Sequence, residues 1–435
     1  MKSSFPGIKT ANIITLGCSK NLVDSEVMMR QLKAAGIETL HDSNSPADVV
    51  IINTCGFIND AKEESVDTIL QWAGERKRDK IRKLYVMGCL SQRYKEDLVR
   101  EMPEVDGFFG VNDLNAILSA LNAPLRNELL DERVITTPAH YAYLKISEGC
   151  DRKCSFCAIP QIRGKNISKP VDQLVSEARF LAGSGVKELI LIAQDLTYYG
   201  IDLNGKRQLA GLLEVLSGVD GIDWIRLHYA FPAGFPLRVL DIMRDNPKIC
   251  RYLDIPLQHI SNRILKSMKR GLDGQGTRNL IRTIRQRVPG IAIRSSFIVG
   301  YPGETNEEFN ELKRFISENE FERLGVFTYS HEENTPAFRL KDDVRPAVKA
   351  RRAEQIMLLQ QDISAKRNAA LIGNEIKVIV DRKENGYWSG RSEFDSPEVD
   401  NEVVIDDPDG KLYPGLIASV KITGADLYDL KAIAI

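Results

Sequence analysis

Three cysteines stand close together in the middle of the chain, Cys150, Cys154 and Cys157, in the spacing C-x3-C-x2-C. Three thiolates on one short loop can bind three irons of a 4Fe-4S cluster and leave the fourth iron without a protein ligand. An open iron can be chelated by S-adenosylmethionine (SAM), and reductive cleavage of SAM yields a 5′-deoxyadenosyl radical that abstracts unactivated hydrogen atoms. The spacing therefore indicates radical chemistry. We expect Phe156, inside the motif, to shield the cluster from water.

A structural zinc loop is the alternative interpretation of these three cysteines. Structural zinc sites are closed by four ligands. His140 could serve as the fourth ligand, but it lies ahead of the preceding predicted strand rather than in the loop. The three cysteines alone leave this alternative open.

A second group of three cysteines, Cys18, Cys55 and Cys89, is spread over the first hundred residues. Each cysteine follows a short apolar run, and a lone cysteine in that position is most often a small buried apolar residue. Three cysteines at three successive strand ends indicate a second cluster, again with one iron open. That iron could hold an external sulfide. Cys250, by contrast, is expected at the amino end of a strand, where we interpret it as structural.

The elements that must position Cys18, Cys55 and Cys89 are three apolar runs at residues 11–16, 48–53 and 83–87, each followed by a helical pattern. Apolar strands alternating with helices predict a parallel sheet covered on both faces. Ligands bind such sheets at the carboxyl ends of the strands, where the three cysteines stand. Gly17 and Gly88 would allow tight turns beside two of them.

The α/β alternation continues beyond a turn-rich segment, with longer helices. Six strands are expected, at residues 142–147, 188–192, 224–227, 252–255, 291–299 and 324–328, with helical patterns that include 171–182, 263–270, 307–318 and 348–371. Six β/α repeats predict a partial parallel barrel, a (β/α)6 core whose active site lies at the carboxyl ends of its strands. After residue 369, short alternating strands with Gly, Asn and Pro turns predict a small all-β barrel of five strands. The expected domains are residues 9–125, 136–367 and 369–435.

Four residues at expected strand ends are candidates for SAM binding. Gln194 and Asp195 follow one strand, where a group that holds the SAM ammonium is needed; a helix N-cap is the equally good alternative for Asp195. Gly300 and Glu304 follow another strand, where glycine would admit the adenosine portion; the alternative is a tight turn with an acid in the first turn of a helix. We expect His259 and His331 to be hydrogen-bonded scaffold residues.

Composition is that of an ordinary globular protein, with 43% hydrophobic residues, 27% charged residues and a formal net charge of −1 over 435 residues. This balance gives no general basic signal for nucleic acid. Residues 1–11 carry no apolar leader, and no apolar run reaches the ~18 residues of a membrane span. We therefore expect a cytoplasmic protein with no membrane association, whose clustered cysteines bind metal rather than form disulfides.

The chain resembles the methylthiotransferases of the radical SAM superfamily over nearly its full length. The matching segments are LGCSKNLVDSE (16–26), INTCGFI (52–58), GCLSQRY (88–94), GCDRKCSFCAIPQIRG (149–164), AQDLTYYG (193–200), YLDIPLQH (252–259), IVGYPGET (298–305), YSHEENTPA (329–337) and SPEVD (396–400). The tRNA-modifying branch usually reads GCQMN where this chain has GCSKN, and asparagine where it has Asp195. Both differences favour the branch that modifies a ribosomal protein.

The resemblance implies an amino-terminal methylthiotransferase domain, a radical SAM core and a carboxy-terminal TRAM barrel. It implies that Cys150, Cys154 and Cys157 bind the SAM-cleaving 4Fe-4S cluster and that the other three cysteines bind an auxiliary 4Fe-4S cluster. The implied product carries a methylthio group on the β-carbon of an aspartate of small-subunit ribosomal protein S-twelve, made from two SAM molecules. The implied partners are that protein and an electron donor such as flavodoxin or ferredoxin. Residues 228–232 (HYAFP) depart from the short H-x-P-like turn of the family, which puts the substrate-loop geometry in doubt.

Two other functions are alternatives for this sequence: a tRNA adenosine methylthiotransferase, and a non-catalytic metal-bearing RNA-binding protein. Residues 369–435 contain seven Lys or Arg and thirteen Asp or Glu, a net charge of −6. An RNA-binding barrel needs a basic groove for phosphates, whereas an acidic barrel attracts a basic ribosomal protein. The charge balance favours a protein substrate. We do not expect the terminal barrel to bind RNA.

Overall fold

The computed structural model describes residues 7–435. The chain divides into two compact units. The first comprises the residues up to Thr137 together with Glu148–Asp151 and Ala158–Ile167; the second comprises Pro138–Ser147, Arg152–Cys157 and Ser168–Ile435. The C-x3-C-x2-C segment therefore contributes residues to both units.

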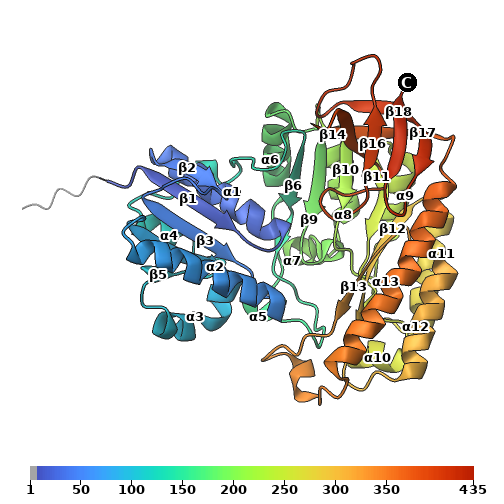
Figure 1. The fold of residues 1–435 in the computed structure, drawn as a ribbon, viewed down its shortest axis with the longest axis horizontal. Helices are drawn as coiled ribbons and strands as arrows, with labels where there is room; N and C mark the ends of the chain where they lie inside the picture. Colours follow the sequence, from blue (N-terminus) through green and yellow to red (C-terminus); the bar gives the residue numbers. More distant parts are fainter. Residues whose placement is uncertain (1–6) are drawn as a thin grey trace, which may run out of the picture. The chain divides into compact units, whose positions relative to one another are not determined.

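The first unit is built on a parallel sheet in the order β2-β1-β3-β4-β5, shown in blue in Figure 1. Its strands are β1 (Thr10–Thr15), β2 (Glu38–His41), β3 (Val49–Thr54), β4 (Lys83–Gly88) and β5 (Gly107–Phe108). Its helices are α1 (Ser19–Ala34), α2 (Asn59–Lys77), α3 (Cys89–Glu101), α4 (Leu114–Ala120), η1 (Asn127–Leu129) and α5 (Ile159–Ile162). The expected parallel sheet is confirmed, although the sequence reasoning missed the short edge strands β2 and β5.

Alternate residues of β3 pack into the two apolar clusters on opposite faces of this sheet. Val49 and Ile51 join a buried cluster with Met28 and Leu32 of α1, whereas Val50 and Ile52 join a second cluster on the other face. A strand buried on both faces reads as a continuous apolar run, which is why residues 48–53 could be recognised.

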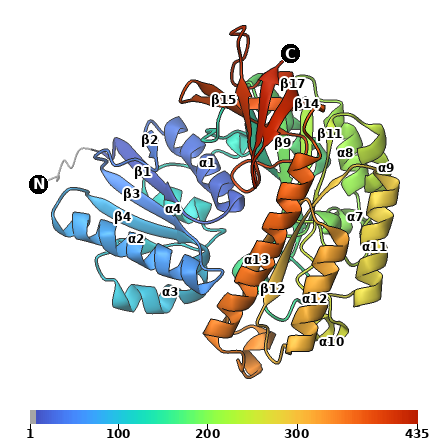
Figure 2. The ribbon, with the colours of Figure 1, turned by 45° about the vertical axis from the view of Figure 1, so that its right-hand side comes forward.

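The second unit begins with a six-stranded parallel sheet in the order β13-β12-β11-β10-β9-β6. Its strands are β6 (Tyr141–Lys145), β9 (Glu188–Ile192), β10 (Trp224–Leu227), β11 (Ile249–Asp254), β12 (Ala292–Val299) and β13 (Arg323–Thr328). Its helices are α6 (Val171–Gly183), η2 (Leu196–Tyr198), α7 (Ile201–Asn204), α8 (Leu209–Ser217), α9 (Arg238–Asp245), α10 (Asn262–Ser267), α11 (Gly274–Arg287), α12 (Asn306–Asn319), η3 (Pro336–Arg339) and α13 (Pro346–Ala369). The six β/α repeats of a partial barrel are confirmed (Figure 2).

Several boundaries in this unit differ from the sequence expectation: β11, expected at 252–255, begins at Ile249, and two further differences lie close to the cysteine segment or its contacts. The helix expected at 263–270 ends at Ser267, and Lys269 has a φ of +57°, outside the helical region. The strand expected at 142–147 ends at Lys145, and β7 (Ser147–Glu148) follows it and pairs with β8 (Ile167–Ser168). The early end of the helix places Arg270 in a loop, where its side chain has a role described below.

The carboxy-terminal module is a closed five-stranded barrel in the order β14-β15-β16-β18-β17. Its strands are β14 (Glu375–Glu384), β15 (Tyr387–Ser392), β16 (Val403–Asp406), β17 (Ile417–Ala425) and β18 (Leu430–Ala434). The predicted small β-barrel is confirmed, and it belongs to the same compact unit as the six-stranded sheet. Ile379 of β14 packs with Trp224, the first residue of β10, and with Tyr252 of β11.

Candidate active site

Cys18, Cys55 and Cys89 come together at the carboxyl ends of β1, β3 and β4, as the sequence predicts. A Cβ placed on Gly17 would lie 3.0 Å from Cys55 Sγ. The pKa of Cys89 is raised to about 12, chiefly by burial; Arg163 opposes this rise, and the neighbouring thiols of Cys18 and Cys55 add to it. The three thiols thus lie within electrostatic range of one another, inside a single unit.

The side chain of Asn21 joins the loops that carry these cysteines. Its amide nitrogen donates to Leu16 O at 2.8 Å and to Thr54 O at 3.1 Å. Its amide oxygen accepts a hydrogen bond from Arg163 Nη2 at 2.6 Å and a weak one from Cys89 Sγ at 3.8 Å. Asn21 is fully buried, so these bonds fix the strand-end loops without competition from water.

Two sources of positive potential face Cys18, Cys55 and Cys89. Cys18 is the N-cap of α1, and Cys89 is the first residue of α3. Helix amino termini carry a partial positive charge that favours thiolates. The buried guanidinium of Arg163 lies beside them, held by Glu148 at 2.9 Å and Asp24 at 3.2 Å. A site of this kind stabilises an anionic group held by thiolates.

The residues present fit an iron–sulfur cluster better than a single metal ion. All seven cysteines are free of disulfides in the described chain. Among residues 7–435, no three His, Cys, Asp or Glu side chains converge closely enough to hold one metal ion. The thiolates that bind a 4Fe-4S cluster each take a different iron, so they need to surround a volume rather than a point.

In the second unit, the backbone around Cys154 is firmly anchored. Ser155 N donates to Met268 O at 3.0 Å, and Ser155 O accepts from Ala337 N at 2.7 Å. Ser155 Oγ donates to Ser267 O at 2.7 Å. Phe156 packs in an apolar cluster with Tyr301 and neighbouring side chains. Its predicted role as a shield of the cluster stays a prediction.

Arg270 places a positive charge directly on this cysteine segment. Its Nη1 lies 3.2 Å from Cys154 Sγ, and its Nη2 donates to Pro256 O at 2.5 Å. Arg270 and Cys154 are both buried. A charged donor at a cluster sulfur shifts the reduction potential of the cluster, so Arg270 is a functional candidate.

Phe231 connects Arg270 with a second arginine. The guanidinium carbons of Arg152 and Arg270 lie 4.1 and 4.2 Å from the centre of the Phe231 ring. Arg152 Nε also donates to Asp195 Oδ2 at 2.8 Å. Residues 228–232, the segment that departs from the family pattern, therefore carry a ring on which two arginines stack.

The four predicted SAM contacts have protein partners of their own. Asp195 accepts bonds from Thr197 N at 2.8 Å and Thr197 Oγ1 at 2.6 Å, so it caps η2 as well as pairing with Arg152. Gln194 is half-buried directly after β9. Their contact with SAM stays a prediction.

The second predicted pair forms a closed network behind its strand. Glu304 is buried, accepts a hydrogen bond from Gly300 N and lies 3.4 Å from Arg352 Nη1. A Cβ on Gly300 would lie 2.3 Å from Lys349 Cγ. The missing side chain at Gly300 thus makes room for Lys349. These contacts support the turn-and-scaffold interpretation, and a SAM contact by Gly300 or Glu304 stays a prediction.

The remaining candidates occupy scaffold positions. His140 Nε2 lies 2.7 Å from Asp381 Oδ1, which gives it a partner in the carboxy-terminal barrel. His259 lies 3.7 Å from Glu304, and His331 contacts Tyr329. Cys250 is the second residue of β11 and is buried in an apolar cluster. The sequence reasoning missed Asn21, Arg163 and Arg270, although the first two lie in segments that it quoted.

Three family models match successive parts of the chain. They are the "Uncharacterized protein family UPF0004" over residues 10–110, the "Radical SAM superfamily" over 144–316 and the "TRAM domain" over 372–435. Among solved structures, the radical SAM methyltransferase TsrM from Kitasatospora setae, with tryptophan substrate and a SAM analogue, is similar with a TM-score of 0.57. The match is 12% identical and covers 83% of this chain and 90% of that one. At that identity the similarity shows the fold alone.

Curated relatives match far more closely. A protein named "Ribosomal protein uS12 methylthiotransferase RimO" from Cytophaga hutchinsonii is 56% identical over 420 residues, which are 96% of each chain. The protein of the same name from Flavobacterium psychrophilum is 57% identical over 419 residues, again 96% of each chain. The sheet, the cysteine segment and the family models define a radical SAM enzyme. The chain belongs to the RimO family of methylthiotransferases.

Proposed function

We propose that the protein inserts a methylthio group at the β-carbon of an aspartate of ribosomal protein uS12, using two SAM molecules for each product. The observation that carries this proposal is near-full-length identity above 55% to proteins named for that reaction, in a chain that has both cysteine groups. We assign the domains to residues 9–125, 136–367 and 369–435.

Cys150, Cys154 and Cys157 would hold the SAM-cleaving 4Fe-4S cluster, and Cys18, Cys55 and Cys89 the auxiliary cluster. When bound, these groups supply electron transfer to SAM and a site for sulfur. Asn21 holds the strand-end loops that carry the auxiliary group in place, while Arg163 and the starts of α1 and α3 offset negative charge there. Arg270 offsets negative charge at Cys154.

The carboxy-terminal barrel supports a protein partner less strongly than its composition alone suggests. Of its thirteen acidic residues, Asp381, Glu393, Asp395 and Asp400 pair with residues of the six-stranded core. Without these four and the buried Arg391, nine acidic and six basic side chains remain, a net charge of −3. That charge still opposes phosphate binding. The electron donor is expected to be a small redox protein such as flavodoxin or ferredoxin, in the cytoplasm.

Among the described residues, no helix has the length and apolar character that crossing a membrane requires.

The test is anaerobic reconstitution of the full chain, followed by iron analysis, 5′-deoxyadenosine assay and mass spectrometry of uS12. The wild type should bind about eight irons if each group holds one 4Fe-4S cluster. Replacing Cys150, Cys154 and Cys157 by alanine should halve the iron and abolish SAM cleavage. Replacing Cys18, Cys55 and Cys89 should halve the iron and retain 5′-deoxyadenosine formation without methylthiolated uS12. Cys250→Ala is the matched control and should keep all the iron.

A colourless wild-type protein with stoichiometric zinc would contradict both cluster assignments. Methylthio product from tRNA and none from uS12 would instead leave both clusters in place and assign the protein to the tRNA-modifying branch.

A further inference from the structure

The loop between β15 and β16 of the small barrel packs against one face of the six-stranded sheet. The strand register places Glu188, Arg226, Tyr252, Arg294 and Arg323 on this face. Apart from Glu188, which Arg391 of β15 contacts, each of these side chains bonds to residues 392–400. The carboxy-terminal barrel therefore closes the end of the sheet at which its strands begin.

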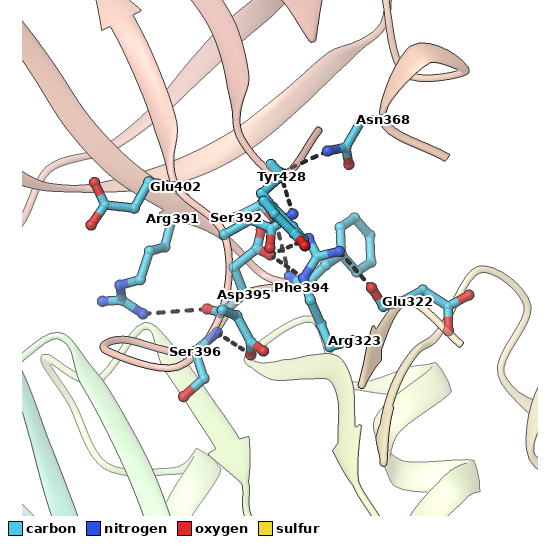
Figure 3. Close-up of polar contacts among 12 residues, drawn as sticks. Glu322, Arg323, Asn368, Arg391, Ser392, Phe394, Asp395, Ser396, Glu402 and Tyr428 are labelled. Carbon is cyan, nitrogen blue, oxygen red and sulfur yellow. Dashed lines mark hydrogen bonds and ion pairs between the residues drawn. The ribbon is translucent and has the colours of Figure 1, made fainter. Parts of the chain in front are cut away.

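Most of these contacts are charged or polar and buried. Arg226 is fully buried and donates to Glu393 O at 2.7 Å. Asp395 forms an ion pair with Arg323 (Figure 3). Asp400 accepts from Tyr252 Oη at 2.6 Å. Broken buried ion pairs are costly, so this loop is fixed in one position.

One contact of the loop reaches beyond the strands. Ser396 Oγ and His228 Nε2 lie 2.8 Å apart, and both side chains are buried. His228 is the first residue after β10, at the carboxyl end of that strand, where the candidate site lies. The small barrel thus contacts the first residue of the 228–232 segment.

From His228, contacts continue to Cys154. Tyr229 O accepts a hydrogen bond from Leu196 N at 3.1 Å, which holds the turn next to Asp195. Phe231 carries the stacked guanidinium groups of Arg152 and Arg270, and Arg270 bonds to Cys154. The segment thus has contacts at both of its ends.

Backbone strain lies close to both partners of this contact. Tyr229 has a φ of +64°, and Glu398 has a φ of +69°. Non-glycine residues keep such conformations only where the surrounding structure imposes them, often at functional positions. One strained residue lies beside His228 and the other lies two residues after Ser396.

We propose that Ser396 and His228 are positioning residues: through their hydrogen bond, the carboxy-terminal barrel holds the 228–232 segment so that Arg152 and Arg270 are oriented at the SAM-cleaving cysteine segment. This inference rests on the proposed function. It makes the terminal barrel a structural part of the SAM site, in addition to any role that it has toward the substrate.

The test is a double-mutant cycle in the full-length, reconstituted enzyme, with Ser396→Ala, His228→Phe and the double variant. The readouts are KM for SAM, kcat for 5′-deoxyadenosine and the electron paramagnetic resonance spectrum of the reduced cluster with SAM. Each single variant should raise KM about five- to tenfold, the effect of one lost hydrogen bond. The double variant should have a KM no higher than that of the more impaired single variant. His228→Gln should restore most of the affinity and the spectrum that His228→Phe loses.

Ser389→Ala is the matched control, because Ser389 is equally buried but donates to Glu402 inside the small barrel. It should lower thermal stability without changing KM or the spectrum. A Ser396→Ala variant that behaves like this control, or single effects that add in the double variant, would overturn the proposal. If His228→Phe does not fold, the comparison of Ser396→Ala with Ser389→Ala decides. A wild type that cleaves SAM without modifying uS12 contradicts only the proposed function.

Discussion

Arg270 donates a charged hydrogen bond to the sulfur of Cys154 at 3.2 Å, and this bond should raise the reduction potential of the cluster there. Arg270→Gln should therefore make SAM cleavage slower and the cluster harder to reduce. We expect a fall of roughly 40 mV for each ~1 kcal/mol of lost interaction in a one-electron couple. Redox titration followed by paramagnetic resonance measures it, in the variant that lacks Cys18, Cys55 and Cys89. Arg270→Lys should lose less, and equal potentials in all three proteins would exclude the role.

Gly17 and Gly36 offer a matched pair for testing the site formed by Cys18, Cys55 and Cys89. Both have positive φ, +89° and +83°, so alanine costs about 1 kcal/mol of backbone strain at either position. A Cβ on Gly17 would lie 2.7 Å from Cys55 Cβ, whereas nothing lies within 4 Å at Gly36. Gly17→Ala should lose up to half of the iron and all methylthio product while 5′-deoxyadenosine formation continues. Gly36→Ala should keep both, and equal iron in the two variants would contradict the placement of Cys55.

At this scale, residue type and strand position were enough to find Cys18, Cys55 and Cys89, because parallel strands bring their carboxyl ends together. The partners of these cysteines were not predictable. Arg163 meets Asn21 across 142 residues of sequence, and nothing in either local pattern points to the other. For Asp195, the structure supports the N-cap interpretation, since the carboxylate caps η2, while the SAM contact stays a prediction.

Glu188 of β9 allows a test of the buried charges between the six-stranded core and the small barrel. Glu188 is fully buried and contacts Arg226 at 2.7 Å and Arg391 at 2.8 Å. Glu188→Gln leaves two buried arginines without their shared carboxylate, so the free energy of unfolding should fall by about 3–5 kcal/mol. Chemical denaturation of the full chain, followed at the transition of the second unit, measures this free energy. Glu214→Gln, at the exposed pair with Arg238, should cost less than about 1 kcal/mol. A small effect at Glu188 would mean that the arginines find other partners.

The same buried charges predict how the free energy of unfolding changes as the pH falls. Burial alone would raise the pKa values of Glu188 and Asp381, but their arginine and histidine partners hold both below the ordinary values of 4.5 and 3.8. A lowered folded pKa contributes stability that is present above the unfolded value and is lost as the pH falls through the folded value. Unfolding free energy should therefore decline below about pH 4.5. Asp400, whose pKa burial raises, acts in the opposite direction.

A Glu188→Gln variant should show a shallower decline in acid than the wild type, measured by denaturation from pH 7 to pH 3. An unchanged pH profile would contradict the depressed pKa of Glu188.

Elements with a clear apolar pattern were predictable, whereas short ones were not. Strand β3 reads as an unbroken buried run, but β5 has only two residues and gives no pattern. The sequence of β10, WIRL, contains an early sign of the polar face, an arginine within an otherwise apolar strand. Two of the partners of Arg226, the backbone carbonyls of Ser392 and Glu393, lie more than 160 residues away in the small barrel, so sequence periodicity could not assign them.

At the scale of the whole chain, the remaining −3 charge of the small barrel predicts how the enzyme meets a basic ribosomal protein. Asp406→Lys with Asp409→Lys in the full-length chain should slow association with uS12 several-fold and weaken its salt dependence, because steering is screened over about 8 Å at physiological ionic strength. Asp407 is left unchanged because it accepts backbone bonds from Lys411 and Leu412. Stopped-flow binding across a salt series measures the effect.

The control is Glu96→Lys with Asp97→Lys, which makes the same change in charge on an exposed part of α3. It should alter association less than the barrel variant. Faster binding of tRNA than of uS12 by the wild type would contradict the assignment of a protein substrate.

The position of residues 392–400 has a consequence for the order in which the protein can fold during synthesis. The ribosome makes the six core strands first, yet Arg226, Arg294 and Arg323 receive partners from a loop near the end of the chain. Until that loop emerges, Arg323 lacks its carboxylate partner, and Arg226 and Arg294 keep only their core partners Glu188 and Asp254. Burial of incompletely paired charge is costly, so these arginines favour hydration until the loop arrives. The starts of the strands should therefore close last, after more than nine-tenths of the chain has been translated. A nascent chain stalled at residue 371 should remain open to protease at β10 and β12.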